Sequence, residues 1–144
     1  VGVHMDGEGD ITKQARVWEK DGKGQGTDVP SPVVAAGKAY VLSDSGQINC
    51  FDLKTGEEKW KRRLKGPVSS SPVLANGHIY WANELGTHYV FKANPEQLEL
   101  VAENQLGSES FASPTIVGGE IFHRTATRQG GKRQEWLYCL GKRT

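Results

Sequence analysis

Residues 31–41 read SPVVAAGKAYV, and related stretches follow as SPVLANGHIYW at residues 71–81 and SPTIVGGEIFH at residues 113–123. Each stretch opens on serine and proline, has a glycine five residues after the proline, and has an aromatic residue three residues after that glycine. The copies are spaced by 40 and then 42 residues. Periods of this length are typical of repeat architectures, in which a unit buries its apolar faces only by stacking on its neighbours.

The composition excludes several classes of protein. Eighteen basic and 17 acidic residues leave a net charge of +1, so no global field favours nucleic acid or an acidic membrane. No apolar stretch approaches the roughly 18 to 20 residues of a membrane span, and no secretory signal is visible. Because the chain begins at Val1 rather than a methionine, we expect it to be a fragment of a longer protein.

The two cysteines are too few for a disulfide framework. Cys50 and Cys139 occupy the same place in two repeats, and Val90 takes that place in the middle repeat. A position that alternates between valine and cysteine is predicted to hold a small, buried, apolar side chain.

Each repeat contains strand-sized runs separated by Gly, Asn, Asp and Ser, which favour turns. The expected strands are 29–35, 39–43, 47–53 and 57–64 in the first block, and 73–75, 78–83, 86–93 and 98–106 in the second. The third block predicts strands over 113–117, 120–125 and 136–140, with a polar turn over 126–135 that is seven residues longer than its counterpart. Because Trp18 stands 42 residues before Trp60, a further fourth-type strand is expected over 15–20.

Four antiparallel strands per unit, repeated around an axis, describe a β-propeller, whereas a sandwich or a barrel would not need near-identical spacing in successive blocks. The proline at each first strand also favours a propeller. Proline donates no ladder hydrogen bond and is confined to strand ends and sheet edges, and a first strand that lines the central channel is such an edge. We predict an all-β fold, a partial β-propeller of four-stranded antiparallel blades with about three blade equivalents. The predicted division is a fourth strand and Gly-rich connector over 1–28, blades over 29–68 and 69–110, and a blade without its fourth strand over 111–144.

The most specific motif lies in residues 52–60, which read DLKTGEEKW. It resembles the aspartate-alanine-x-threonine-glycine-x-x-x-tryptophan signature of the pyrroloquinoline-quinone-like propeller repeat family, and the likeness covers residues 29–141. The second repeat departs from it, with KANPE at 92–96 and no tryptophan near Ala102. More narrowly, residues 9–13, which precede Trp18, and residues 138–142 resemble the last third of large secreted propellers found in planctomycetes and related bacteria.

The resemblance implies that the signature tryptophan docks each blade on its neighbour. The structural blade-docking residues expected on this basis are Trp18, Trp60, Pro32, Pro72, Pro114, Gly37, Gly77, Gly119 and Gly56.

The same resemblance implies two functions. Family members include quinoprotein alcohol dehydrogenases, which hold a quinone and calcium over the propeller axis, and non-catalytic relatives such as the outer-membrane assembly lipoprotein. The adjacent cysteines of the dehydrogenases are missing here, and no Asp, Glu and Asn cluster resembles a hard-cation site. We therefore expect no catalytic residue, no metal site and no cofactor in this chain alone. Pyrroloquinoline quinone and calcium would require a site supplied by other blades.

The prediction is a non-catalytic binding scaffold that presents loops such as 126–135 to a protein or other macromolecular partner, without nucleic acid. The alternative is part of a quinone-dependent dehydrogenase of alcohols or sugars. Since three blades do not close a ring, the remaining blades come from a longer chain or from oligomerisation. The resemblance implies a periplasmic or extracellular location.

Three further features have plainer structural explanations. The four histidines (His4, His78, His88 and His123) lie at unrelated spacings, which does not fit a zinc site. The Gly-rich run over 21–28 precedes a strand rather than a helix, which predicts a connector rather than a phosphate-binding loop. The basic run over 59–65 could place cations on phosphates and Trp60 on a base, but an outermost, solvated strand explains it as well.

Overall fold

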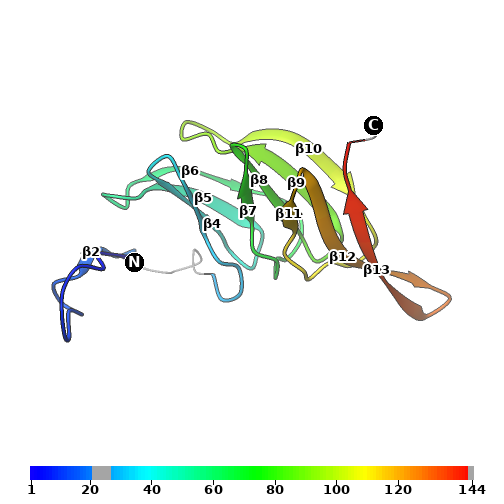
Figure 1. Ribbon diagram of the computed structural model, residues 1–144, viewed down its shortest axis with the longest axis horizontal. Coiled ribbons are helices and arrows are strands. Elements are labelled where there is room, and N and C mark those ends of the chain that lie inside the picture. Colours follow the sequence, from blue (N-terminus) through cyan, green and yellow to red (C-terminus); the bar gives the residue numbers. More distant parts are fainter. Residues whose placement is uncertain (21–26, 143–144) are drawn as a thin grey trace.

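The computed structural model describes residues 1–20 and 27–142, and within these ranges every regular element is a β-strand (Figure 1). The all-β fold class is therefore confirmed. A helix that could cross a membrane is absent from the described part of the chain. In the described residues, thirteen strands form one two-stranded sheet, two four-stranded sheets and one three-stranded sheet, and all of their pairings are antiparallel.

The sheets follow the chain order. A small N-terminal sheet pairs β1 (Gly2–Val3) with β2 (Arg16–Trp18). The first blade contains β3 (Val33–Ala35), β4 (Lys38–Leu42), β5 (Gln47–Asp52) and β6 (Glu58–Arg63). The second blade contains β7 (Val73–Ala75), β8 (His78–Ala82), β9 (Thr87–Lys92) and β10 (Glu99–Gln105). The third blade contains β11 (Thr115–Val117), β12 (Glu120–Gln129) and β13 (Lys132–Leu140).

The turn between the first and second strand of each blade explains the repeated glycine. The two central residues have positive φ in all three turns: 48° and 72° at Ala36 and Gly37, 48° and 71° at Asn76 and Gly77, and 60° and 82° at Gly118 and Gly119. Two-residue hairpin turns of this type match the twist of the flanking strands and favour Asn-Gly or Gly-Gly. Ala36 is therefore the residue that fits its turn least well.

The first strands of successive blades lie side by side, since β3 contacts β7 and β7 contacts β11 (Figure 1). The remaining strands of each blade run outward from this line in sequence order. The main core lies between the first two blades and is formed by Tyr40, Leu42, Ile48, Cys50, Trp60, Val68, Ile79, Trp81, Tyr89 and Phe91. The first two blades are thus held together by apolar contact across their faces.

Two predictions about the third blade are wrong. The polar stretch 126–135 is not a loop, because β12 and β13 continue as a regular ladder to Gln129 and Lys132. A Gly130-Gly131 turn, with φ of 55° and 77°, closes this ladder, and the Thr, Arg and Gln side chains along it tolerate a solvated strand. We call residues 126–135 the ribbon.

The second correction concerns the cysteines. Cys50 is fully buried, but Cys139 is exposed. Cys50 lies on β5 between β4 and β6, whereas β13 pairs only with β12 among the described strands. The same repeat position therefore has a different environment in the third blade, and the prediction of a buried side chain holds only for Cys50.

Candidate functional site

The signature turn after β5 is organised around the Asp52 carboxylate. Its Oδ1 accepts hydrogen bonds from the backbone amides of Lys54 and Thr55, both at 3.0 Å, and its Oδ2 accepts one from Lys38 Nζ at 3.1 Å. These donors hold the pKa of Asp52 well below its usual range. The Gly56 amide in turn donates to the Asp52 carbonyl at 2.8 Å. The aspartate, threonine and glycine of the motif thus build one tight turn.

Trp18 lies against this turn. Its Nε1 donates to the Leu53 carbonyl at 2.8 Å, and its ring centroid is 6.4 Å from that of Phe51. A Cβ on Gly56 would lie 2.6 Å from Trp18 Cδ2, so only glycine leaves room for the indole. The glycine of one signature and the tryptophan of the preceding one are therefore in direct contact.

Trp60 makes the corresponding contact one blade later. It is 7% exposed, its Nε1 donates to the Asn94 carbonyl at 3.0 Å, and its ring lies 6.0 Å from that of Tyr40. The second blade carries Asn94-Pro95-Glu96 instead of Lys54-Thr55-Gly56, yet its turn still supplies a carbonyl acceptor.

The Ser-Pro steps form a second set of contacts between blades. The Ser31 amide donates to Ser71 Oγ at 2.9 Å, and the Ser71 amide donates to Ser113 Oγ at 2.8 Å. Each serine thus bonds to its counterpart in the next blade. The prolines that follow stand just before β3, β7 and β11, with Pro72 and Pro114 buried and Pro32 exposed. The sequence predicted a docking role for the prolines but not for the serines, although both repeat with the same period.

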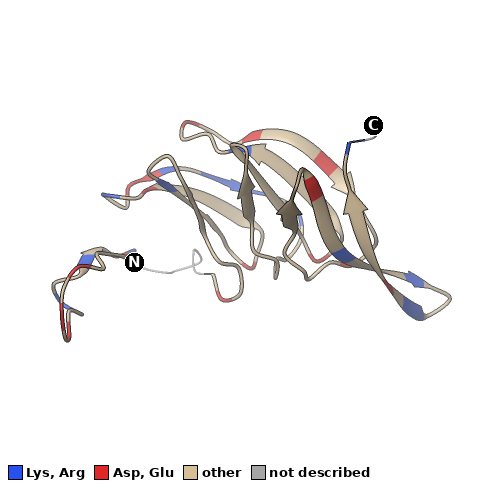
Figure 2. Ribbon diagram, in the orientation of Figure 1, with Lys and Arg blue, Asp and Glu red and all other residues tan. Residues whose placement is uncertain are grey.

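The ribbon carries a network of charged side chains around two glutamates. Glu109 accepts hydrogen bonds from Arg128 and, at 2.9 Å, from Arg133 Nε. Glu135 accepts from Arg133 and, at 3.1 Å, from Arg124 Nη2. These guanidinium groups lower the pKa of both carboxylates. Figure 2 shows the basic residues on the ribbon.

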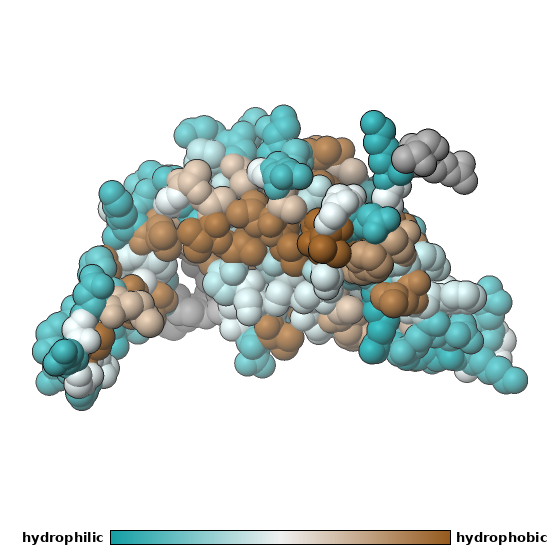
Figure 3. Space-filling view, viewed as in Figure 1, coloured by the Kyte–Doolittle hydropathy of each residue, from teal (hydrophilic) through white to brown (hydrophobic). Residues whose placement is uncertain are grey.

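Two large side chains next to this network are exposed. Trp136 is 47% exposed and donates from Nε1 to Thr127 Oγ1 at 3.1 Å, while Leu137 is 75% exposed. Figure 3 shows that the ribbon, which projects at the right of the view, is largely hydrophilic, whereas apolar residues gather in a band across the middle of this face.

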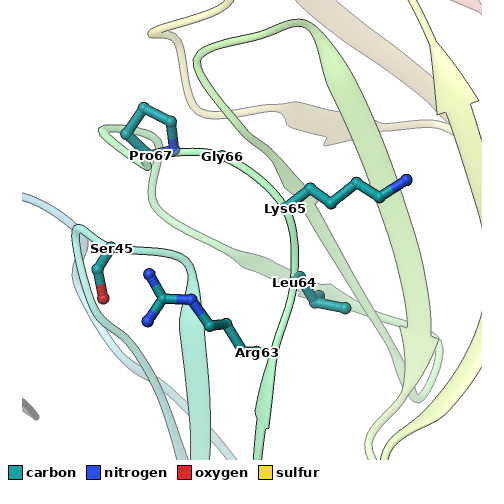
Figure 4. A pocket seen from close by; sticks show the side chains of 6 residues that line it. All are labelled: Ser45, Arg63, Leu64, Lys65, Gly66 and Pro67. Carbon is teal, nitrogen blue, oxygen red and sulfur yellow. The ribbon is translucent and has the colours of Figure 1, made fainter.

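The predicted basic run 59–65 does not form one cationic cluster. Lys59 pairs with Glu57 at 2.7 Å and Lys61 with Glu58 at 3.5 Å. Where the run leaves β6, an open groove of about 630 Å³ follows residues 63–67 (Figure 4). In this view the Arg63 side chain turns toward Ser45 and Lys65 points the other way. The groove therefore presents one guanidinium rather than a paired anion site.

Two of the histidines that the spacing did not connect lie together in the structure. The rings of His88 and His123 are 4.4 Å apart and meet edge to face. His88 Nδ1 lies 3.0 Å from the Gly86 carbonyl and His123 Nε2 lies 2.7 Å from Ser110 Oγ. Burial lowers the pKa of His88, and burial together with the neighbouring His88 lowers that of His123 to about 4. Both rings are therefore uncharged at neutral pH.

The described residues do not fit a calcium site. Within residues 1–20 and 27–142, no group of three or more His, Cys, Asp or Glu side chains could hold a metal ion. The predicted Gly-rich connector over 21–28 lies outside the described residues except for Thr27 and Asp28. The Asp28 amide donates to Asp44 Oδ2 at 2.9 Å.

Comparisons with known proteins give consistent results for the fold. Residues 10–98, more than half of the chain, match the family model described as outer membrane protein assembly factor BamB. A comparison with curated proteins finds no match.

Three solved structures illustrate the likeness. BamB from Moraxella catarrhalis has a TM-score of 0.59 and 17% identity over 90% of this chain and 44% of its own. A europium-containing methanol dehydrogenase has a TM-score of 0.57 and 18% identity over 75% of this chain and 24% of its own. The quinohemoprotein alcohol dehydrogenase from Comamonas testosteroni has a TM-score of 0.56 and 19% identity over 77% of this chain and 21% of its own. The chain thus spans less than half the length of each, and at these identities the likeness supports the partial propeller fold alone.

Proposed function

The chain belongs to the propeller repeat family described as outer membrane protein assembly factor BamB, and from this premise we propose that it is part of a non-catalytic scaffold that binds a protein partner. The ribbon is the proposed contact surface. The observation that carries the proposal is the placement of exposed Trp136 and Leu137 beside the arginine network, on a hairpin that projects from the blades (Figure 1).

The side-chain chemistry of the ribbon supports this role. Tryptophan and arginine are enriched among the residues that dominate protein interfaces. Arg133 bonds to both Glu109 and Glu135, so its guanidinium is held in place before a partner arrives. Such ordering reduces the entropy that binding would otherwise cost. The glutamates leave the surface mixed in charge, which favours a protein partner over a polyanion.

Site-specific crosslinking in the full-length protein tests this function. A photo-reactive residue replaces Leu137, and a matched control replaces Leu100, which is 44% exposed on β10. The proposal expects a discrete crosslinked partner from position 137 and none from position 100, and loss of that partner's association on Leu137→Asp. Equal crosslinking at both positions, or unchanged association of Leu137→Asp, would contradict it.

The second candidate is part of a quinone-dependent dehydrogenase, supported by the structural likeness to methanol and alcohol dehydrogenases. Adding pyrroloquinoline quinone and calcium to the full-length protein separates the two candidates. Dye reduction that requires both additions would favour the dehydrogenase. A bound chromophore and dye reduction should both be missing if the scaffold proposal holds.

Three further points belong to the same proposal. By family resemblance we place the protein in the periplasm or outside the cell. We also propose that the chain divides at 28/29, 68/69 and 110/111 into an N-terminal segment and three blades. We also propose that the remaining blades of the ring are supplied by a longer chain or by other copies.

A further inference from the structure

The junction between the second and third blades is not closely packed. A cavity of about 290 Å³ lies there, and a second cavity of about 340 Å³ adjoins it. Both are lined by Tyr80, Ile121 and Leu140. Tyr80 belongs to β8 of the second blade, and the other two residues belong to β12 and β13 of the third.

The same three positions surround Trp60 at the preceding junction. There the equivalent residues are Tyr40, Ile79 and Phe91, and all three share one buried cluster with Trp60. Trp60 stands opposite Cys50 in the β5–β6 ladder, and Ala102 stands opposite Val90 in the β9–β10 ladder. Since Cys50 and Val90 are equivalent, Ala102 occupies the place of the missing tryptophan.

The ladder partner of Ala102 places it beside the cavity of about 290 Å³. Ala102 pairs with Val90, and Val90 lines this cavity together with Asn104 and Gln105 of β10. Directly opposed residues of neighbouring strands share a face of the sheet. This cavity therefore lies on the face of β10 from which a tryptophan at position 102 would project.

The walls of the 290 Å³ cavity are mostly apolar and aromatic. Tyr80 supplies an aromatic ring, and Val90, Ile121 and Leu140 supply apolar side chains. The polar groups on the walls include His88 and His123, and His123 is only 1% exposed. Among the described residues, His88 Nε2 and His123 Nδ1 are buried without a hydrogen-bond partner. Buried polar atoms of this kind ordinarily have one.

We propose that the cavity between the second and third blades binds a small, uncharged, planar aromatic molecule of about the size of indole, with an N–H or O–H group that donates to a histidine nitrogen. Apolar cavities on the order of 150 Å³ bind benzene, and the Tyr80 ring adds an aromatic contact. The free imidazole nitrogens supply the acceptor. This inference does not rest on the proposed scaffold function.

Indole is the probe for the test, titrated into the protein by calorimetry with thermal melts in parallel. We expect saturable binding to one site and a melting temperature that rises with indole. Ala102→Trp fills the site and should weaken indole binding at least tenfold. Glu103→Trp is the matched control and should bind as the wild type does, because Glu103 is exposed and pairs with Tyr89, which lies on the opposite face from Val90. Wild-type protein that shows no saturable binding, or Ala102→Trp that binds equally well, would overturn the proposal.

Two measurements on the wild type keep the test decisive if Ala102→Trp does not fold. Nuclear Overhauser contacts should connect indole protons with the methyl groups of Ile121 and Leu140. 1-Methylindole, which lacks the N–H donor, should bind at least tenfold more weakly than indole. The absence of these contacts, or equal affinity for the two compounds, would contradict the assignment.

Discussion

The two blade junctions differ at the position of the signature tryptophan. At the first, Trp60 is almost fully buried against residues of the second blade and donates to the Asn94 carbonyl. At the second, Ala102 stands in the equivalent place and a cavity remains. Both junctions nevertheless have the same contacts between neighbouring first strands and the same serine hydrogen bonds at the Ser-Pro steps. These contacts thus set how successive blades are placed, while the tryptophan determines how densely the blades pack.

The largest expected effect comes from emptying the filled junction. Trp60→Ala removes a buried indole and its hydrogen bond, and core substitutions of this kind typically cost about 3–5 kcal/mol. Chemical denaturation should show this loss, whereas the control Trp136→Ala, at an exposed ring, should change stability by less than about 1 kcal/mol. An unchanged unfolding midpoint for Trp60→Ala would contradict a docking role.

A second effect concerns acid and the open junction. The pKa of His123 is lowered to about 4 in the folded protein from an ordinary value of 6.5, so the unfolded chain binds more protons between these values. Stability is therefore fully present above pH 6.5 and falls as the pH drops toward 4. A lowering of this size corresponds to about 3 kcal/mol.

Thermal melts between pH 7.5 and 5 measure this dependence, because Glu109 and Glu135 have lowered pKa values and titrate at lower pH. His123→Phe should flatten the curve, and the remaining slope should come from His88, whose pKa is also lowered. The same slope in His123→Phe and wild type would remove His123 as its source.

A smaller effect is expected where Trp18 meets the signature turn. Gly56→Ala places a methyl group against the indole and also strains a backbone with φ of 70°. Gly37→Ala is the matched control, because its φ is 72° but nothing lies within 4 Å of its Cβ position. We expect Gly37→Ala to cost about 1 kcal/mol and Gly56→Ala more, with faster proteolysis of the N-terminal sheet only for Gly56→Ala. Equal proteolysis would argue against the contact.

The smallest effect lies outside both junctions. Ala36 has φ of 48° in an exposed turn, a conformation that costs a residue with a Cβ about 1–2 kcal/mol. Ala36→Gly should therefore raise the free energy of unfolding by up to about 1 kcal/mol, which would appear as a slightly higher melting temperature. Asn76→Gly in the equivalent turn should be near neutral, since asparagine tolerates positive φ. A lower melting temperature for Ala36→Gly would contradict this account.

The comparison also shows what the sequence could predict. The period of proline, glycine and aromatic residues predicted the strands and turns, because both depend on local chemistry that repeats. The missing tryptophan near Ala102 was visible too, but a cavity depends on whether neighbours move in to fill it. His88 and His123 lie 35 residues apart on different blades, so their contact required the stacking of the blades. The ribbon was missed because its polar strands lack a buried face, and hence lack an apolar alternation.

The second junction should have the space of a missing tryptophan side chain. The free energy of unfolding of Ala102→Trp, measured without any ligand, tests this point most directly. A side chain that restores the packing of the first junction should stabilise the protein by about 0.5–2 kcal/mol, as cavity-filling substitutions commonly do. Destabilisation by about 1–3 kcal/mol, the usual result of overpacking, would show that the space does not match an indole and would contradict the account.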